Sequence, residues 1–215
     1  MSQYLTVQGS GTVSATPDQI IIGFQLSQIN REYNKSVSDL NKKLEQLYQS
    51  LEKEGIEGTQ VKLFDYSVSA NYEYVDEHRN KKVLTGYIAS YSLQLEIDLE
   101  PKAINRVLGM VANSAQEVEI SLDFTVKDTE TFKNQALEKA ITSAKSKAEL
   151  IAKATGVTLG KIENITYGKI LVEVRARHME IEASRNYAPD FLESRDITPG
   201  DVSMSDDVTI TWEIS

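Results

Sequence analysis

The sequence feature that most constrains the fold is a run of alanines at every fourth position of a predicted helix. The stretch ALEKAITSAKSKAELIAKATG, residues 136–156, places alanines at positions 136, 140, 144, 148 and 152. Four residues exceed the 3.6-residue turn, so this series drifts by about 40° per step. It runs beside a stripe of Leu137, Ile141, Ala144, Ala148 and Ile151. Because these side chains are mostly small, we expect the helix axis to lie close to a sheet and beside the first helix.

Apolar periodicity predicts the other elements. Alternation indicates strands around residues 5–7, 20–26, 64–74, 87–99, 118–126, 162–173 and 208–214, whereas spacings of three and four indicate helices around 37–51 and 100–115. Gly9 and Gly11 interrupt the first alternation, which we interpret as a strand bend or bulge. A phosphate loop at GSG is disfavoured, because no helix follows it and no Lys-Ser/Thr pair is present.

This element order predicts an α+β fold with mainly antiparallel sheets, three helices packed on one face and a long protruding β-hairpin. The arms of that hairpin are about twice the usual strand length. We expect one domain over residues 1–215, or two lobes formed by residues 1–62 with 158–215 and by residues 63–157. Residues 175–207 lack apolar periodicity and contain Pro189, Pro199 and Gly200, so we predict a mobile loop there.

Composition excludes several functional classes. The net charge is −9, whereas nucleic-acid binding requires clustered lysine and arginine. The chain has no cysteine, which excludes disulfides, thiol catalysis and cysteine-ligated metal. No apolar run is long enough for membrane insertion. The first residues lack the pattern of a signal peptide, so we expect a cytoplasmic protein, or a periplasmic or secreted one if a leader has been removed.

Residues that could carry chemistry are scattered. His78 and His178 have no neighbouring metal-binding partner, so we predict no metal site and no cofactor. No serine lies in a GxSxG motif. The acidic pairs could form a glycosidase site or a metal cluster only by converging in space, and we interpret them as surface charge: Asp76 and Glu77, Glu180 and Glu182, Asp206 and Asp207. We therefore predict no enzymatic activity.

Five of the ten tyrosines lie in the predicted hairpin: Tyr66, Tyr72, Tyr74, Tyr87 and Tyr91. Cross-strand aromatic pairs would stabilise the hairpin by about 0.2–1 kcal/mol each. Tyrosine is also enriched in protein interfaces, because it combines an apolar ring with a polar tip. These tyrosines are therefore either structural or a candidate protein interface.

Several motifs also occur together in one order along the chain: VQGSGTVSATPD (7–18), LEKEGI (51–56), GYIA (86–89), the alanine helix through GKIENI (136–165) and TPGDVSMSDDVTITWEI (198–214). This ordered set resembles the SIMPL-domain family, which includes bacterial periplasmic immunogenic proteins and animal proteins named for binding a Pelle-like kinase. The resemblance implies an α+β fold without an established enzymatic activity or cofactor. It also implies that some bacterial members form large ring-like or channel-like oligomers, and that some are linked to stress tolerance. Many bacterial relatives carry a signal peptide, which is not visible here.

We therefore expect a non-enzymatic SIMPL-type protein that self-associates, acts through contacts with an unknown protein partner and has a stress-related role. The alternative is a module that binds a small or peptide ligand in a groove between the helices and the hairpin. A hydrolase with a dispersed carboxylate site is the third class.

Overall fold

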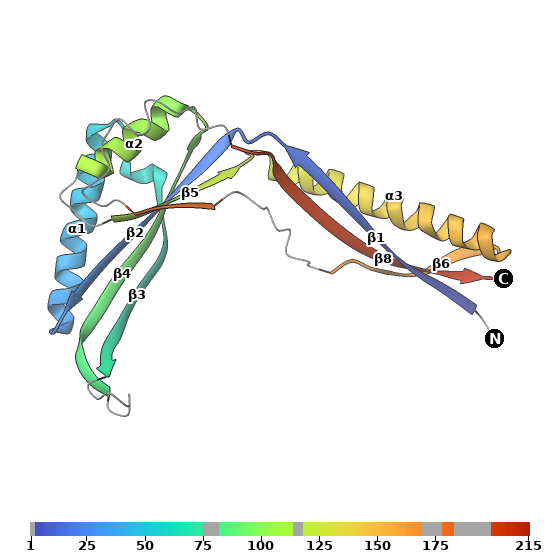
Figure 1. Cartoon of the computed structure of the whole chain (residues 1–215), viewed down its shortest axis with the longest axis horizontal. Helices are drawn as coiled ribbons and strands as arrows, with labels where there is room; N and C mark the ends of the chain where they lie inside the picture. The colour runs from blue at the N-terminus through green and yellow to red at the C-terminus, as the bar shows by residue number, and fades with distance from the viewer. Residues whose placement is uncertain (1–2, 75–81, 114–117, 169–177, 183–198) are drawn as a thin grey trace. The chain divides into compact units, whose positions relative to one another are not determined.

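The chain forms two compact units, each built on one β-sheet (Figure 1). The computed structural model describes residues 3–74, 82–113, 118–168, 178–182 and 199–215. Unit 1 comprises residues 1–17, 125–177 and 199–215, and unit 2 comprises residues 18–124 and 178–198. The lobes predicted from sequence have other boundaries, because they place the first two strands together, whereas these strands belong to different sheets.

Unit 2 contains a five-stranded sheet in the order β3-β4-β2-β5-β7. Its strands are β2 (Gln19–Asn30), β3 (Val61–Tyr74), β4 (Lys82–Asp98), β5 (Val118–Thr125) and β7 (His178–Glu182). The β2–β4, β3–β4 and β5–β7 pairs are antiparallel, as predicted. Its helices are α1 (Tyr33–Lys53), the short 3₁₀ helix η1 (Gly58–Gln60) and α2 (Pro101–Asn113).

The core of unit 2 lies between this sheet and the two α-helices. The α1 residues Leu40, Leu47 and Leu51, from the predicted helical stripe, are buried there. From the sheet, alternate residues of β2, β4 and β5 enter the same core, including Phe24, Leu93 and Leu122. Gly55, with a φ of 80°, follows the end of α1, where the left-handed conformation favours glycine. The helix predicted around residues 37–51 is therefore confirmed.

Unit 1 contains a three-stranded antiparallel sheet in the order β1-β8-β6 and one long helix. Its elements are β1 (Gln3–Ala15), α3 (Thr129–Thr155), β6 (Leu159–Thr166) and β8 (Val202–Ile214). Asp128 caps α3 by accepting a hydrogen bond from the Thr131 N–H at 3.0 Å, and Gly156 ends the helix with a φ of 74°. The structure thus confirms the α+β class, although the three helices are divided between two sheets.

The alanine series is itself the contact line of α3. All five alanines are buried, whereas Ile151 is 39% exposed, and Leu137 and Ile141 are only half-buried. The sheet beneath α3 contributes Val7, Val208, Ile210 and Trp212 to the shared core. The helix packs on a sheet, as predicted, but its larger apolar residues flank the contact instead of forming it. The first helix, expected as a neighbour, belongs to unit 2.

Gly9 and Gly11 serve this contact, so their interpretation as a bend or bulge is wrong. β1 pairs with β8 without interruption from residue 3 to residue 15, and both glycines point inward. A Cβ added to Gly9 would overlap the carbonyl oxygen of Ala140 and lie 2.7 Å from the Cβ of Ala144. A Cβ on Gly11 would overlap the Ala136 carbonyl oxygen. The glycines therefore let the helix backbone approach the strand backbone directly.

The end of the chain is more regular than its apolar pattern suggests. β8 begins at Val202 instead of Val208, because Val202, Met204 and Asp206 continue the buried alternation. The polar Asp206 conceals this pattern when only apolar residues are considered. The segment 175–207, predicted to be a mobile loop, includes β7 and the first six residues of β8, while residues 175–177 and 183–198 lie outside the described part.

Enlarging a buried alanine tests the close packing of α3. Ala144→Leu or Ala148→Leu should lower the free energy of unfolding by about 1–3 kcal/mol, because the contact has no room for three more heavy atoms. Lys145→Leu, at an exposed position of α3, should be close to neutral, since leucine has good helix propensity. Urea unfolding measures all three variants. Wild-type midpoints for both alanine variants would contradict close packing.

A second change tests the same contact from the strand side. In most strands Gly→Ala is stabilising by about 0.5–1 kcal/mol, because glycine loses more conformational freedom on folding. Gly9→Ala should instead be destabilising, because the added Cβ would overlap the backbone of α3. Ser10→Ala, on the exposed face of the same strand, is the matched control. Thermal unfolding decides the question, and a Gly9→Ala melting temperature at or above the wild-type value would refute the role of the glycine.

Candidate functional site

The β3–β4 hairpin extends past the rest of its sheet (Figure 1). The last residue of β2, Asn30, pairs with Tyr87 of β4. Beyond that pair, residues 71–74 of β3 and 82–86 of β4 have only each other as described strand neighbours. Two register shifts occur along the hairpin, one at Phe64 of β3 and one at Thr85 of β4. The predicted protruding hairpin is present, and its far end is a two-stranded ribbon.

Large apolar side chains are exposed along this hairpin. Seven of them have exposed fractions between 40% and 74%, and we call them the hairpin surface: Leu63, Phe64, Tyr66, Tyr72, Tyr74, Val83 and Leu84. Single exposed apolar residues are common, but a group of them on one element marks a candidate contact site. The tyrosine pattern indicates part of this surface. It misses Leu63, Phe64, Val83 and Leu84, because alternation alone does not show which strand lies at the sheet edge.

Two of the five candidate tyrosines hold the hairpin to α1. The Tyr91 hydroxyl donates a hydrogen bond to Oδ1 of Asn41 at 2.9 Å. The ring of Tyr87 meets the ring of Tyr33 edge-on, with centroids 5.6 Å apart and an interplanar angle of 82°. Both contacts join β4 to the adjacent helix, so these tyrosines have a structural role within unit 2.

The other three tyrosines are exposed on β3. Tyr66 stacks on Tyr91 with centroids 4.8 Å apart, and partial desolvation raises the pKa of the Tyr66 hydroxyl. Tyr72 and Tyr74 lie on the two-stranded ribbon, where Lys82 Nζ lies 5.2 Å from the centroid of the Tyr74 ring. The five candidates are therefore not one cluster. Tyr66, Tyr72 and Tyr74 form the exposed aromatic part of the hairpin surface.

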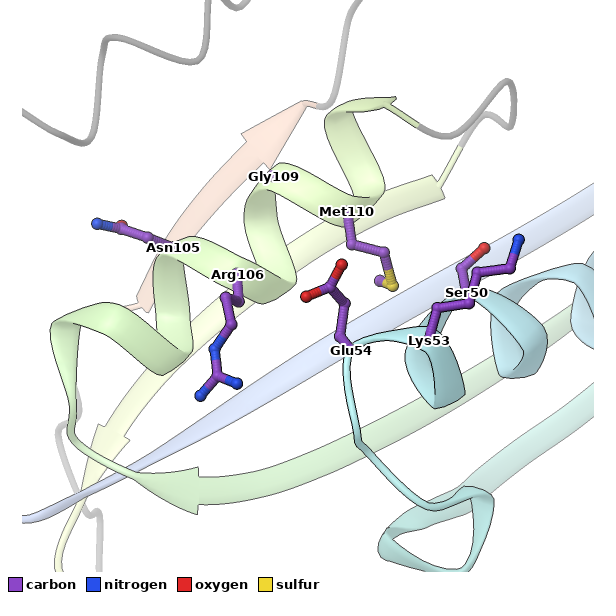
Figure 2. A pocket seen from close by; sticks show the side chains of 7 residues that line it. All are labelled: Ser50, Lys53, Glu54, Asn105, Arg106, Gly109 and Met110. Atoms are coloured by element: carbon purple, nitrogen blue, oxygen red, sulfur yellow. The ribbon is translucent and has the colours of Figure 1, made fainter.

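A shallow groove of about 400 Å³ lies between the end of α1 and α2 (Figure 2). Lys53 and Arg106 in this groove are exposed and Glu54 is half-buried, so the groove is polar and open to water. Small-ligand sites are usually enclosed and mainly apolar. The expected ligand groove between helices and hairpin thus differs from the groove observed, which is lined by Ser50, Lys53, Glu54, Asn105, Arg106, Gly109 and Met110.

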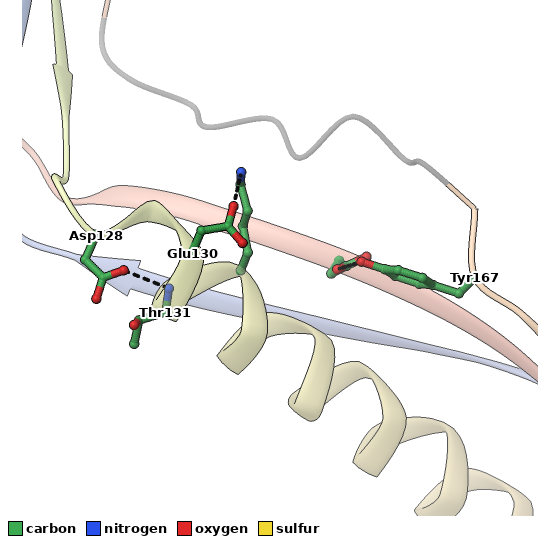
Figure 3. A network of polar contacts seen from close by, with 6 residues as sticks. Asp128, Glu130, Thr131 and Tyr167 are labelled. Carbon is green, nitrogen blue, oxygen red and sulfur yellow. Dashed lines mark hydrogen bonds and ion pairs between the residues drawn. The ribbon is translucent and has the colours of Figure 1, made fainter.

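Two separate groups of polar contacts lie in unit 1: Tyr167, directly after β6, is bonded to Asp206 of β8, and Asp128 is bonded to Thr131 at the start of α3 (Figure 3). Asp206 is 3% exposed and accepts hydrogen bonds from the Tyr167 hydroxyl at 3.0 Å and from the Asp207 N–H at 2.8 Å. The hydrogen bond to Asp206 raises the pKa of Tyr167. At the helix terminus, hydrogen bonds from the side chain and backbone of Thr131 lower the pKa of Asp128. Both carboxylates are satisfied by local donors, as expected of structural groups.

The structure places only some of the remaining candidate residues. Asp206 and Asp207 occupy consecutive positions of β8, so they point to opposite faces of the sheet. His178, Glu180 and Glu182 belong to β7, whereas His78, Asp76 and Glu77 lie outside the described residues. Within the described residues, no group of three or more histidine, cysteine, aspartate or glutamate side chains could hold a metal ion.

The family of the chain follows from comparison with known proteins. The model of the SIMPL family, described as a protein of unknown function (DUF541), matches residues 5–212. The chain belongs to the SIMPL family. The match spans both units, so it covers the residues of the helix–sheet contact of unit 1 and of the hairpin of unit 2. No curated protein matches the sequence significantly. None of the helices within the described residues has the length and apolarity needed to cross a membrane.

The network around Asp206 makes a testable prediction about stability. Tyr167→Phe should lower the free energy of unfolding by about 1 kcal/mol at neutral pH, because buried Asp206 loses a hydrogen-bond donor. The raised pKa of Tyr167 means that the fold favours the protonated phenol. This stabilisation is fully present below the unfolded tyrosine pKa of about 10 and is lost as pH rises through the higher folded pKa.

Urea unfolding of the wild type and of Tyr167→Phe from neutral pH to about one pH unit above the unfolded tyrosine pKa measures this difference. Tyr4→Phe changes a similarly exposed tyrosine of unit 1 and serves as the control. A Tyr167→Phe deficit that stays constant over this whole range, or equals that of Tyr4→Phe, would show that the bond to Asp206 contributes nothing.

Proposed function

We propose that this SIMPL-family protein is a non-enzymatic protein that self-associates and acts through protein–protein contacts at the hairpin surface. The observation that carries the proposal is the exposure of Tyr66, Tyr72 and Tyr74 on one strand at the edge of a sheet. Such side chains bury a large apolar area on contact while their hydroxyl groups keep hydrogen bonds. Tyrosine is accordingly among the residues enriched at interface hot spots.

The local structure supports a contact role over a purely internal one. Tyr87 and Tyr91 already join the hairpin to α1, so the hairpin does not need further tyrosines for its attachment. The ribbon that carries Tyr72 and Tyr74 extends beyond β2. A two-stranded ribbon is marginally stable in water, and covering its apolar side chains would stabilise it.

Small-ligand binding in the groove between α1 and α2 is the weaker candidate. The groove offers both charge signs, Lys53 and Arg106 against Glu54, but all of them are accessible to water. Exposed ion pairs in water contribute only about 0–1 kcal/mol each. The hairpin surface, which is apolar, would gain more from contact.

Removing the two outer tyrosines tests the proposal. Size-exclusion chromatography with light scattering over a concentration series should show wild-type masses that rise above the 24.0 kDa of one chain. Tyr72→Ser combined with Tyr74→Ser should weaken this association by at least about tenfold, since buried interface tyrosines act as hot spots. Tyr4→Ser, an exposed tyrosine of unit 1, should leave it unchanged. A wild-type mass of one chain at every concentration would reject the proposed function.

A further inference from the structure

We infer that β3 pairs antiparallel with β3 of a second copy, about a two-fold axis at Val68, so that the two sheets join edge to edge. This inference rests on the proposed function and specifies its contact. β3 has 14 residues and lies at one end of the strand order of its sheet. Its outer backbone groups therefore offer a template for another strand.

Lysine side chains of the helices donate hydrogen bonds to backbone carbonyl oxygens of other strands, but within the described residues they donate none to those of β3. In unit 1, Lys139 and Lys147 of α3 donate hydrogen bonds to the carbonyl oxygens of Thr12 and Gln8 on the edge strand β1, at 3.1 and 3.0 Å. In unit 2, Lys43 of α1 donates to the Ser27 carbonyl oxygen at 2.9 Å. Within the described residues, no lysine or arginine donates to a backbone carbonyl of β3. The β1 edge is thus protected against strand addition, whereas the β3 edge remains available.

The pairing of β3 with β4 assigns each β3 side chain to one face. Leu93 and Leu95 of β4 are core residues on the face covered by α1. The β3 residues that share this face lie opposite them or continue the two-residue period: Val61, Leu63, Tyr66, Val68, Ala70, Tyr72 and Tyr74. The polar face carries Lys62, Asp65, Ser67, Ser69, Asn71 and Glu73, and Phe64 is the extra residue at the register shift.

Strand pairing between two copies must match side chains on the same face, which leaves few registers. A two-fold axis at Val68 pairs all thirteen positions of β3 other than Phe64. On the polar face, Lys62 lies opposite Glu73 of the second copy, and this ion pair occurs twice. On the apolar face, Val61 meets Tyr74, Leu63 meets Tyr72 and Tyr66 meets Ala70, so large side chains lie against smaller ones.

Neighbouring registers are poorer. An axis at Ser69 would place Asp65 opposite Glu73, and like charges directly opposite each other are destabilising. An axis at Ser67 would leave Glu73 beyond the paired residues and place Lys62 opposite Asn71. The charges of β3 are therefore complementary to those of β3 itself in one register, which favours a second copy over an unrelated strand as the occupant.

Single cysteines test this register directly, because the chain has none of its own. A disulfide needs Cα atoms within about 7 Å, and directly opposite antiparallel residues lie about 4.5–5.5 Å apart. Val68→Cys should therefore form a disulfide-linked dimer under mild oxidation. Ser67→Cys and Ser69→Cys should each cross-link poorly alone, because in this register the Cα atoms of the same residue in the two copies lie about 8 Å apart. When these two variants are mixed, they should cross-link with each other, because Ser67 of one copy lies opposite Ser69 of the other in this register. Ser10→Cys, at an exposed position of unit 1, is the control for cross-links formed by random collision.

Charge reversal provides an independent measurement. Glu73→Lys would place two lysines opposite each other at both ends of the pair, and Lys62→Glu would do the same with glutamates. Each variant alone should associate roughly tenfold more weakly than the wild type. An equimolar mixture should recover most of the affinity, because Lys62→Glu in one copy then faces Glu73→Lys in the other. Lys62 also binds Glu96 within its own chain at 2.8 Å, so the mixture is compared with each single variant.

The outcomes separate the two proposals. Preferential Val68→Cys dimers together with recovery in the charge-reversed mixture support the β3 pairing. A wild-type oligomer in which Val68→Cys cross-links no better than Ser10→Cys overturns the pairing and leaves the proposed function standing. If Val68→Cys does not cross-link but Ser69→Cys does, the two strands pair in another register, and the proposed pairing about Val68 is overturned as well. A wild type that remains one chain at every concentration overturns both.

Discussion

The close approach of α3 to β1 is the constraint on which unit 1 depends. Four residues of helix advance about 6 Å and two residues of strand advance about 6.8 Å, so alanines at every fourth position can follow glycines at every second. Gly11 meets Ala136 and Ala140, and Gly9 meets Ala140 and Ala144. Here two backbones come into contact without intervening side chains. The apolar area buried per residue is small, and the gain comes from a dense contact between regular surfaces.

The same geometry explains how the β1 edge of this sheet is protected. Because α3 lies so close to β1, lysine side chains from the helix reach carbonyl oxygens of the strand. Lys139 and Lys147 are eight residues apart, and they reach Thr12 and Gln8, four strand residues apart. The contact that packs the unit also places donors on its edge strand. Unit 2 is built differently, with large side chains between its sheet and helices, and its β3 edge carries no such donors within the described residues.

This contrast between the two units is the basis of the functional interpretation. A protein that avoids all association has reason to protect every edge strand. Here the β1 edge carries lysine donors, whereas the β3 edge carries Tyr66, Tyr72 and Tyr74 and a complementary pair of charges. We attribute the proposed association of this SIMPL protein to that second edge. Of the hairpin tyrosines, Tyr87 and Tyr91 attach β4 to α1, whereas the others are exposed on β3 and belong to the proposed contact surface.

The sequence alone determined most elements, because local periodicity records which residues face a core. The helix around residues 37–51 and the long hairpin follow from patterns within short segments of the chain, and the family follows from the order of several motifs along it. The strand boundaries that the sequence predicted wrongly, those of β1 and β8, share a cause. Gly9, Gly11 and Asp206 occupy inward positions of these strands without having large apolar side chains. Each of these residues fits its inward position because of a contact with a part of the chain that is distant in sequence. The glycines contact the backbone of α3, and Asp206 accepts a hydrogen bond from the Tyr167 hydroxyl.

The candidate site shows the same division. Its tyrosines are visible in the sequence, but alternation is identical for a central strand and an edge strand. Only strand order placed β3 at the edge, and only side-chain contacts separated Tyr87 and Tyr91 from Tyr72 and Tyr74. Sequence thus determined what each segment could form, because hydrophobic periodicity is local. Tertiary structure decided which surfaces remain uncovered, because exposure depends on neighbours that lie far away along the chain.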